Sequence, residues 1–273
     1  MTDQQQTEPG GVKIEVWNDE TKITKWRQLL RPWNNFWLTE PMNSAAIFVL
    51  DEKCIQSLSR LLLWQVLYDD TPIVVARAPD DQIIGFIYSM KDYSKEGKAA
   101  HPELVVKRDL YNFKECSFPE QVLTRLLAVD AFLNKLCSKV NVFGIFGVKK
   151  AWVIQIICIL PEYRERGIAK RLTEKTLEIA YAEGFRLAVT EATSSITKHN
   201  MTKHFKFQSI AELGYETNYK NYKWLSEDMK REHRAASLLV KSLHPEKSTS
   251  QQKTKFIAMD LSKKVAHRKM SGY

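Results

Sequence analysis

The stretch of residues 154–180 constrains this chain most, because it joins an apolar run to an amphipathic pattern through a turn of small and basic residues. Residues 153–160 are rich in β-branched side chains and end at Pro161, which cannot donate to a sheet ladder, so a strand should close there. From Ile168 onward, apolar residues recur at helical spacing, while charged residues take the other face. The sequence therefore predicts a strand, a short turn and a helix that packs on a sheet.

The turn between them carries Arg164, Gly167 and Ala169 at the spacing R-x-x-G-x-A, with Arg166 and Lys170 close by. The first turn of a helix has unpaired N–H groups and the positive end of the helix dipole. A pyrophosphate can bind there when no bulky side chain shields the backbone. The spacing matches neither the nucleoside-triphosphate nor the dinucleotide pattern. The alternative interpretation is an ordinary tight turn before a surface helix.

The segment P-E-Y-R-E-R-G-I-A-K-R-L resembles the coenzyme A motif of the Gcn5-related N-acetyltransferases, [RQ]-x-x-G-x-[GA] between a strand and a long helix. The resemblance implies an α/β fold with a mixed, mostly antiparallel sheet, flanking helices and two strands that splay at the acetyl-CoA site. It also implies acetyl-CoA as co-substrate, with backbone N–H groups near Ile157 and Ile159 binding the thioester oxygen. The coenzyme-binding residues implied are Ile157, Cys158, Ile159, Arg164, Arg166, Gly167, Ile168, Ala169 and Lys170.

Hydrophobic periodicity in the rest of the chain predicts strands and helices in an order that fits this fold. We expect strands over residues 12–17, 71–78, 82–90, 153–160, 186–192, 208–213 and 256–261. We expect helices beginning near Thr21 and ending before Pro32, and over residues 54–68, 120–137, 168–180, 194–205 and 225–243. Loops are expected over 33–43, 91–101 and 245–255.

Length and composition favour one domain, because 273 residues with 44% hydrophobic side chains can bury a large core. We expect a disordered N-terminus (1–11), an acetyltransferase domain (12–262) with a charged helix and loop insertion (225–255), and a basic tail (263–273).

Composition also bears on whether a metal, a membrane or a nucleic acid is a partner of this chain. The four cysteines are dispersed and indicate neither a zinc site nor a disulfide framework, so no metal is expected. No signal peptide or membrane span is predicted, and we expect a cytoplasmic monomer. The net charge of +9 is dispersed and lacks an aromatic-interleaved basic motif, so a nucleic-acid partner is not expected.

Two further segments resemble one branch of the family, the invertebrate arylalkylamine N-acetyltransferases, which include dopamine acetyltransferases. Residues 36–43, F-W-L-T-E-P-M-N, resemble that branch's F-x-x-x-E-P-[LM]-[NG] loop. Residues 191–207 occupy the place of its [ST]-rich turn and short helix. The match departs at Lys206, where the branch has glycine, which puts the geometry of that turn in doubt.

The resemblance assigns Glu40 as general base and Thr193 and Thr197 as catalytic hydroxyls. Chemistry supports the first role, because an amine arrives as an ammonium ion and must lose a proton before it attacks a thioester. Aromatic neighbours would desolvate Glu40 and raise its pKa. The alternative is that Glu40 is a solvated loop carboxylate. Candidates to protonate the departing thiolate are Thr197, Tyr215, Tyr219 and Tyr222.

Trp33, Phe36, Trp37 and Met42 are the expected walls of the amine pocket, where aromatic rings would stabilise a cation. Burial in the core is the commoner fate of such residues. Cys158 is likewise either a coenzyme contact or a simple core thiol.

These features predict an acetyl-CoA-dependent N-acetyltransferase that acts on a small primary amine, such as dopamine, tyramine or serotonin. Direct attack in a ternary complex is expected, because no well-placed nucleophile is seen. Two alternatives stay open: a protein, peptide or polyamine acetyltransferase, and a non-catalytic acyl-CoA or nucleic-acid binding module.

Overall fold

The computed structural model describes residues 11–47, 50, 52–67, 69–94, 120–216 and 231–243. The chain divides into a compact unit of residues 1–241 and a second unit of residues 242–273, of which only residues 242 and 243 are described. Within the described ranges, no helix is both long and apolar enough to cross a membrane.

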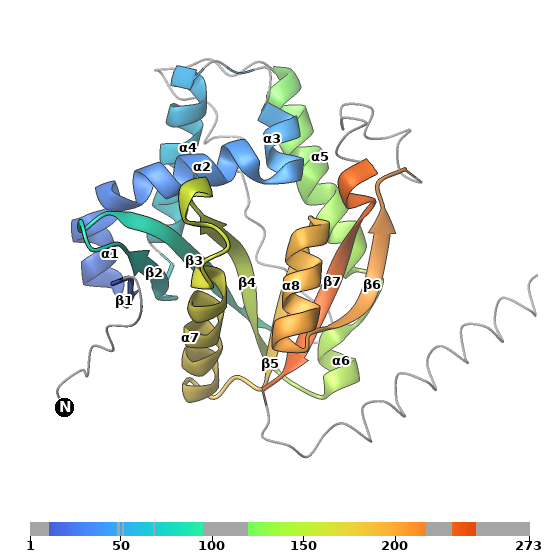
Figure 1. Ribbon diagram of the computed structural model, residues 1–273. Coiled ribbons are helices and arrows are strands. Elements are labelled where there is room, and N and C mark those ends of the chain that lie inside the picture. The colour runs from blue at the N-terminus through green and yellow to red at the C-terminus, as the bar shows by residue number, and fades with distance from the viewer. Residues whose placement is uncertain are drawn as a thin grey trace, which may run out of the picture. The chain divides into compact units, whose positions relative to one another are not determined.

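A seven-stranded sheet, in the order β1-β2-β3-β4-β5-β7-β6, runs through the described residues (Figure 1). The first four strands pair antiparallel in sequence order, β4 and β5 are parallel, and β6 and β7 are antiparallel. The predicted mixed, mostly antiparallel sheet is therefore confirmed, as are six of the predicted strands. The bounds are β1 (Lys13–Trp17), β2 (Ile73–Arg77), β3 (Ile83–Tyr93), β4 (Lys150–Ile159), β5 (Leu187–Ala192), β6 (Gln208–Gly214) and β7 (Ala235–Ser242).

The strands β4 and β5 separate soon after they meet. Their pairing covers three residue pairs, from Trp152 opposite Ala188 to Ile154 opposite Thr190. Strand β4 continues to Ile159 and stays paired with β3 on its other edge. On the side of β5, residues 155–159 of β4 therefore have no strand partner. This separation of β4 from β5 is the splay that the family resemblance implies.

Helices cover the sheet and bracket this splay. Helix α7 (Ile168–Ala182) packs against β1, β2, β3 and β4, whereas α2 (Leu30–Thr39) crosses β3 and β4 at the upper end of the sheet in Figure 1. Helix α8 (Ser195–Phe205) packs on β5. The other helices are α1 (Asp19–Lys25), the 3-10 turns η1 (Trp26–Leu29) and η3 (Pro161–Tyr163), α3 (Pro41–Ile47), α4 (Glu52–Leu67), α5 (Glu120–Cys137) and α6 (Val142–Phe146). Neither α3 nor α6 was expected.

Three predictions from the sequence are wrong. The loop expected over residues 91–101 begins late, because β3 continues to Tyr93. The loop expected over residues 33–43 is helical, since Pro32 lies in the first turn of α2, where its missing N–H is not needed, and Pro41 begins α3. The helix expected over residues 225–243 is replaced at its end by β7, whose residues 236–240 are all buried. The expected strand at residues 256–261, Tyr219 and Tyr222 lie outside the described residues.

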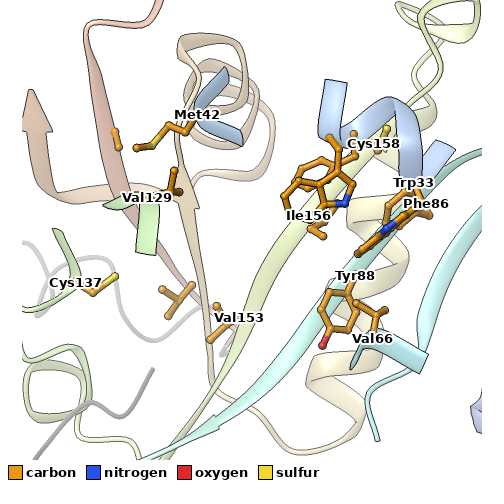
Figure 2. Close-up of a cluster of buried hydrophobic side chains, with 14 of the residues drawn as sticks. Trp33, Met42, Val66, Phe86, Tyr88, Val129, Cys137, Val153, Ile156 and Cys158 are labelled. Atoms are coloured by element: carbon orange, nitrogen blue, oxygen red, sulfur yellow. The ribbon is translucent and has the colours of Figure 1, made fainter. Parts of the chain in front are cut away.

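A continuous cluster of buried apolar side chains joins α2, α3, α4 and α5 to the sheet. In Figure 2, Trp33 and Phe86 lie together at one end of this cluster, and Met42 and Val129 lie together at the other. The rings of Trp33 and Phe86 are 5.7 Å apart between centroids. Packing of this kind fixes α2, and with it the residue that follows α2, relative to the strands.

Candidate active site

Glu40 lies between α2 and α3 and is held by both helices. Its N–H donates to the Phe36 carbonyl at the end of α2, at 2.8 Å. Its carboxylate Oε2 accepts a 2.6 Å hydrogen bond from the N–H of Asn43 in the first turn of α3. The Glu40 side chain thus caps α3, a favourable place for a negative charge.

The second oxygen of the same carboxylate is bound by Thr193, which directly follows β5. Thr193 Oγ1 donates to Glu40 Oε1 at 2.6 Å, across 153 residues of sequence. The structure therefore brings together two of the three residues that the resemblance assigns to catalysis. Five residues before Glu40, Asn35 of α2 donates to the Sγ of Cys158 in β4 at 3.4 Å. Helix α2 consequently spans from the open end of β4 to the end of β5.

Burial raises the pKa of the Glu40 carboxyl above its ordinary value of 4.5. Hydrogen bonds from Thr193 and from the backbone of Asn43 and Met42 act in the opposite direction, as does the nearby His233. Desolvation outweighs these effects, because a carboxylate removed from water loses its hydration. A raised pKa brings the carboxyl closer to the pH at which a general base works best.

Tyr215, which directly follows β6, and His233, which ends the helical residues 231–233 before β7, lie near this carboxylate. Tyr215 is fully buried, and its Oη donates to the Thr193 carbonyl at 2.6 Å. Burial and the nearby Glu40 charge raise the pKa of the Tyr215 hydroxyl well above its usual range. His233 Nδ1 lies 3.3 Å from Ser195 Oγ. No pattern in the sequence singled out His233, because it falls where a surface helix was expected.

Thr197, the third catalytic candidate, has a different environment. The Thr197 hydroxyl accepts a 2.9 Å hydrogen bond from Ser194 Oγ. The Thr197 N–H donates to Ser194 Oγ at 3.0 Å. Ser194 is the N-cap of α8, so Thr197 belongs to the capping structure of that helix. No bond between Thr197 and Glu40 appears among the contacts of the described residues.

The turn after α8 forms with Lys206 at the position where the arylalkylamine branch has glycine. It adopts a left-handed conformation (φ 59°) as the C-cap, and its N–H donates to the Met201 carbonyl. The turn geometry doubted from the sequence is therefore present, although a lysine is strained in this conformation.

The four expected pocket residues are all buried among core side chains. Trp33 and Met42 are almost fully enclosed, and Trp33 Nε1 donates to the Ser59 carbonyl at 2.6 Å. Phe36 and Trp37 stack edge to face at 5.5 Å between ring centroids, and retain exposed fractions of 9% and 7%. Packing explains the placement of Trp33 and Met42, and a role for any of the four as an amine wall stays a prediction.

The turn between β4 and α7 has the features of an anion site. Gly167, the N-cap of α7, is left-handed (φ 72°) and provides no side-chain cap, and the first helical turn carries no acidic residue. A Cβ built on Gly167 would meet no atom within 4 Å, so the space beside the helix N-terminus is open. The unpaired N–H groups of the first turn are therefore accessible to a phosphate.

The remaining coenzyme candidates line this turn or the strand before it. Arg164 Nε donates to the Ile159 carbonyl at 3.2 Å, and Arg166 donates to the Glu162 carbonyl at 2.9 Å. Arg164, Arg166 and Lys170 are exposed, Ala169 is half-buried, and Ile168 is buried against the sheet. The two arginines brace the turn through its own carbonyls and keep their remaining N–H groups toward solvent.

Cys158 lies among the residues of the open end of β4. Burial raises the pKa of its thiol to about 11, and its Sγ donates to the Pro32 carbonyl at 3.2 Å. A thiol in this state carries its proton at neutral pH and is a poor nucleophile.

Comparison with known proteins places this geometry in a family. The model of the acetyltransferase (GNAT) family matches residues 24–205. The structure of arylalkylamine N-acetyltransferase 2 from Aedes aegypti is similar, with a TM-score of 0.61, 20% identity, and coverage of 85% of this chain and 99% of that chain. The putative arylalkylamine N-acetyltransferase 7 of the same mosquito gives 0.63 and 16%, covering 85% and 88%. An agmatine N-acetyltransferase gives 0.52 and 16%, covering 84% and 99%. No curated protein matches the sequence.

Proposed function

Since the chain belongs to the GNAT family of acetyltransferases, we propose that it transfers the acetyl group of acetyl-CoA to a small primary arylalkylamine. The observation that carries the proposal is the Glu40 carboxylate, which lies between α2 and the end of β5. It combines a raised pKa with a place at the end of α2, the helix whose Asn35 contacts Cys158 in the open part of β4. A base at this point can deprotonate an amine next to a thioester.

Acetyl-CoA would be held by the turn before α7. The accessible N–H groups of that turn and the exposed Arg164, Arg166 and Lys170 suit a pyrophosphate, because both the helix dipole and the side-chain charges attract anions. Residues 155–159 lack a strand partner on the side of β5, so their backbone groups are available to the pantetheine and the thioester. An N–H group there would stabilise the oxygen of the thioester as it gains charge.

The reaction then proceeds by direct attack. Glu40 accepts a proton from the ammonium ion, directly or through a water molecule, and the free amine attacks the thioester carbonyl. The tetrahedral intermediate collapses with cleavage of the C–S bond; its nitrogen loses a second proton to give the amide, and the thiolate of coenzyme A takes up a proton to leave as the thiol. Thr193 positions the Glu40 carboxylate through its 2.6 Å hydrogen bond.

An acyl-enzyme on Cys158 is the chemical alternative. It would require a thiolate, whereas the Cys158 thiol has a pKa of about 11 and donates its proton to the Pro32 carbonyl. These features favour direct transfer in a ternary complex.

A thiol-release assay with acetyl-CoA tests the proposal against its rivals. The acceptor panel should contain phenethylamine, tyramine, tryptamine, agmatine, spermidine and a lysine-containing peptide. The proposed function predicts fastest turnover with an arylalkylamine. Preferred turnover of the peptide would support a protein acetyltransferase, and coenzyme A binding without turnover of any amine would support a binding module.

A further inference from the structure

Tyr215 binds the backbone of the residue that orients the Glu40 carboxylate. Its Oη donates to the Thr193 carbonyl at 2.6 Å, and Thr193 Oγ1 donates to Glu40 Oε1 at 2.6 Å. Thr193 directly follows Ala192, the last residue of β5, so its carbonyl needs a partner beyond the end of the strand. Because the peptide group is planar, a hydrogen bond to this carbonyl fixes the orientation of the backbone that carries the Thr193 side chain.

The Tyr215 side chain is itself fixed by the core. It is fully buried and stacks on Phe132 of α5, with 5.4 Å between ring centroids and 23° between the ring planes. Helix α5 packs against both β6 and α3, the helix that Glu40 caps. The Tyr215 hydroxyl therefore reaches Thr193 from a rigid position, which is what a supporting contact of a reactive group requires.

The main chain of Tyr215 holds a second segment near Glu40. The Tyr215 N–H donates to the Arg234 carbonyl at 2.9 Å, just before β7. His233, the preceding residue, contacts Ser195 Oγ through its Nδ1 at 3.3 Å. One residue thus joins the end of β5 to the segment that carries His233.

His233 and Tyr215 are the titratable side chains that the tertiary structure brings toward Glu40. His233 favours the ionised carboxylate, and burial together with the Glu40 charge raises the pKa of the Tyr215 hydroxyl. Residues 32–39 and 41–47, on either side of Glu40 in the chain, carry no ionisable side chain.

The hydrogen bond from Thr193 has a larger effect on Glu40 than the charge of His233. Desolvation dominates the Glu40 pKa, and of the influences that oppose it the Thr193 bond is the largest. Glu191, two residues before Thr193 in β5, accepts a hydrogen bond from Cys137 Sγ at 2.9 Å. The ionisation of Glu40 consequently depends on how well the Thr193 hydroxyl is held.

We propose that Tyr215 is a positioning residue for the general base, because it holds the Thr193 backbone and so keeps the Thr193 hydroxyl on Glu40. The proposal deepens the proposed function and rests on it for the role of Glu40. Tyr215 keeps its own proton, which the Thr193 carbonyl accepts. To protonate the departing thiolate, Tyr215 would first have to give up this bond.

Tyr215→Phe tests the assignment, because it removes the hydroxyl but keeps the ring and the main-chain bond to Arg234. The pKa of Glu40, followed by NMR of isotope-labelled glutamate carboxyl groups and assigned with Glu40→Gln, should rise as the bond from Thr193 weakens. At neutral pH, kcat for phenethylamine should fall about tenfold because the base loses its orientation, while KM for acetyl-CoA stays unchanged.

The double variant Tyr215→Phe/Thr193→Val shows whether Tyr215 acts through Thr193. Since Thr193→Val already removes the positioned hydroxyl, adding Tyr215→Phe should leave the Glu40 pKa where Thr193→Val puts it. Two shifts that add in full would overturn the proposal. An unchanged Glu40 pKa in Tyr215→Phe with a large loss of kcat would also overturn it and identify Tyr215 as a proton donor.

Tyr88→Phe is the matched control, since Tyr88 is also a buried tyrosine, but its hydroxyl lies beside Asp69. It should leave the Glu40 pKa unchanged, and a shift equal to that of Tyr215→Phe would contradict the assignment.

Phe132→Leu provides a second variant if Tyr215→Phe does not fold, because it loosens the stacked ring and keeps the hydroxyl. It should raise the Glu40 pKa by a smaller amount, and only when Thr193 is present; no shift would overturn the proposal. A wild-type protein that acetylates no amine would overturn the proposed function, whereas the NMR titration needs no turnover and still decides the role of Tyr215.

Discussion

Thr193 Oγ1 donates a 2.6 Å hydrogen bond to the Oε1 of Glu40, and this bond joins α2 to the end of β5 across the splayed part of the sheet. The backbone of Asn43 occupies the other carboxylate oxygen at 2.6 Å. The carboxylate therefore has a fixed orientation, which a general base requires, and Thr193 is the residue that sets it.

Thr193→Val should raise the apparent pKa of the base in the pH profile of kcat/KM, because a hydrogen bond that favours the ionised carboxylate is removed. Turnover at neutral pH should fall, and Thr193→Ser should restore both quantities. Thr197→Val is the comparison variant, since Thr197 contacts Ser194 rather than Glu40. If Thr197→Val shifted the pH profile as far as Thr193→Val does, Thr193 would lose its distinct role.

Gly167→Val should weaken coenzyme A binding about tenfold or more, because the new side chain enters the open space beside the N–H groups of α7. Isothermal calorimetry measures the dissociation constant. Gly147→Val is a matched control, as Gly147 is also left-handed (φ 64°) with no atom within 4 Å of a Cβ, but ends α6. Equal coenzyme affinity in the two variants would contradict the assignment of the phosphate site.

Glu40 should make the free energy of unfolding depend on pH. Because burial raises its folded-state pKa above 4.5, the stability linked to its proton is present below that value and is lost as pH rises through the folded pKa. The wild type should therefore lose stability relative to Glu40→Gln as pH rises above the ordinary carboxyl pKa of 4.5. Urea unfolding at several pH values measures the difference.

Glu212 provides the control of opposite sign. The hydrogen bond from Lys198 lowers the pKa of the Glu212 carboxyl, so its contribution is present above the ordinary pKa and is lost as pH falls. The difference between wild type and Glu212→Gln should accordingly grow as pH rises. The same trend for Glu40→Gln would show that Glu40 is not desolvated.

Lys206→Gly should raise the free energy of unfolding by about 1 kcal/mol, because glycine adopts the left-handed conformation without the strain of a side chain. Lys203→Gly, within α8, should lower it by about the same amount. Thermal unfolding distinguishes the two. A loss of stability in Lys206→Gly would mean that the lysine side chain contributes more than the strain removes.

Prediction from the sequence succeeded where one local pattern decides the structure. The run of residues 153–160 and the helix from Ile168 became β4 and α7, because β-branched content and helical periodicity are strong local signals. The segments at Pro32 and 235–242 were misjudged for a different reason. Proline is tolerated in a first helical turn, and burial of β7 between two strands overrides the charged pattern that precedes it.

The candidate site was predictable only through family resemblance. No periodicity links Glu40 to Thr193, since their contact depends on how α2 crosses the sheet. His233 lies outside the motifs, and its position near the carboxylate follows from tertiary packing. Side chains brought together by the fold rather than by spacing are those that a single sequence leaves unidentified.

The most direct test of the central claim is the pH dependence of amine acetylation by Glu40→Gln. The substitution keeps the shape of the side chain but removes the base, so kcat should fall about a hundredfold or more while coenzyme A affinity stays unchanged. The wild-type rate should rise with pH through an apparent pKa that is absent from the variant. A variant with near-normal turnover and the wild-type pH profile would remove Glu40 from the mechanism and contradict the proposed function.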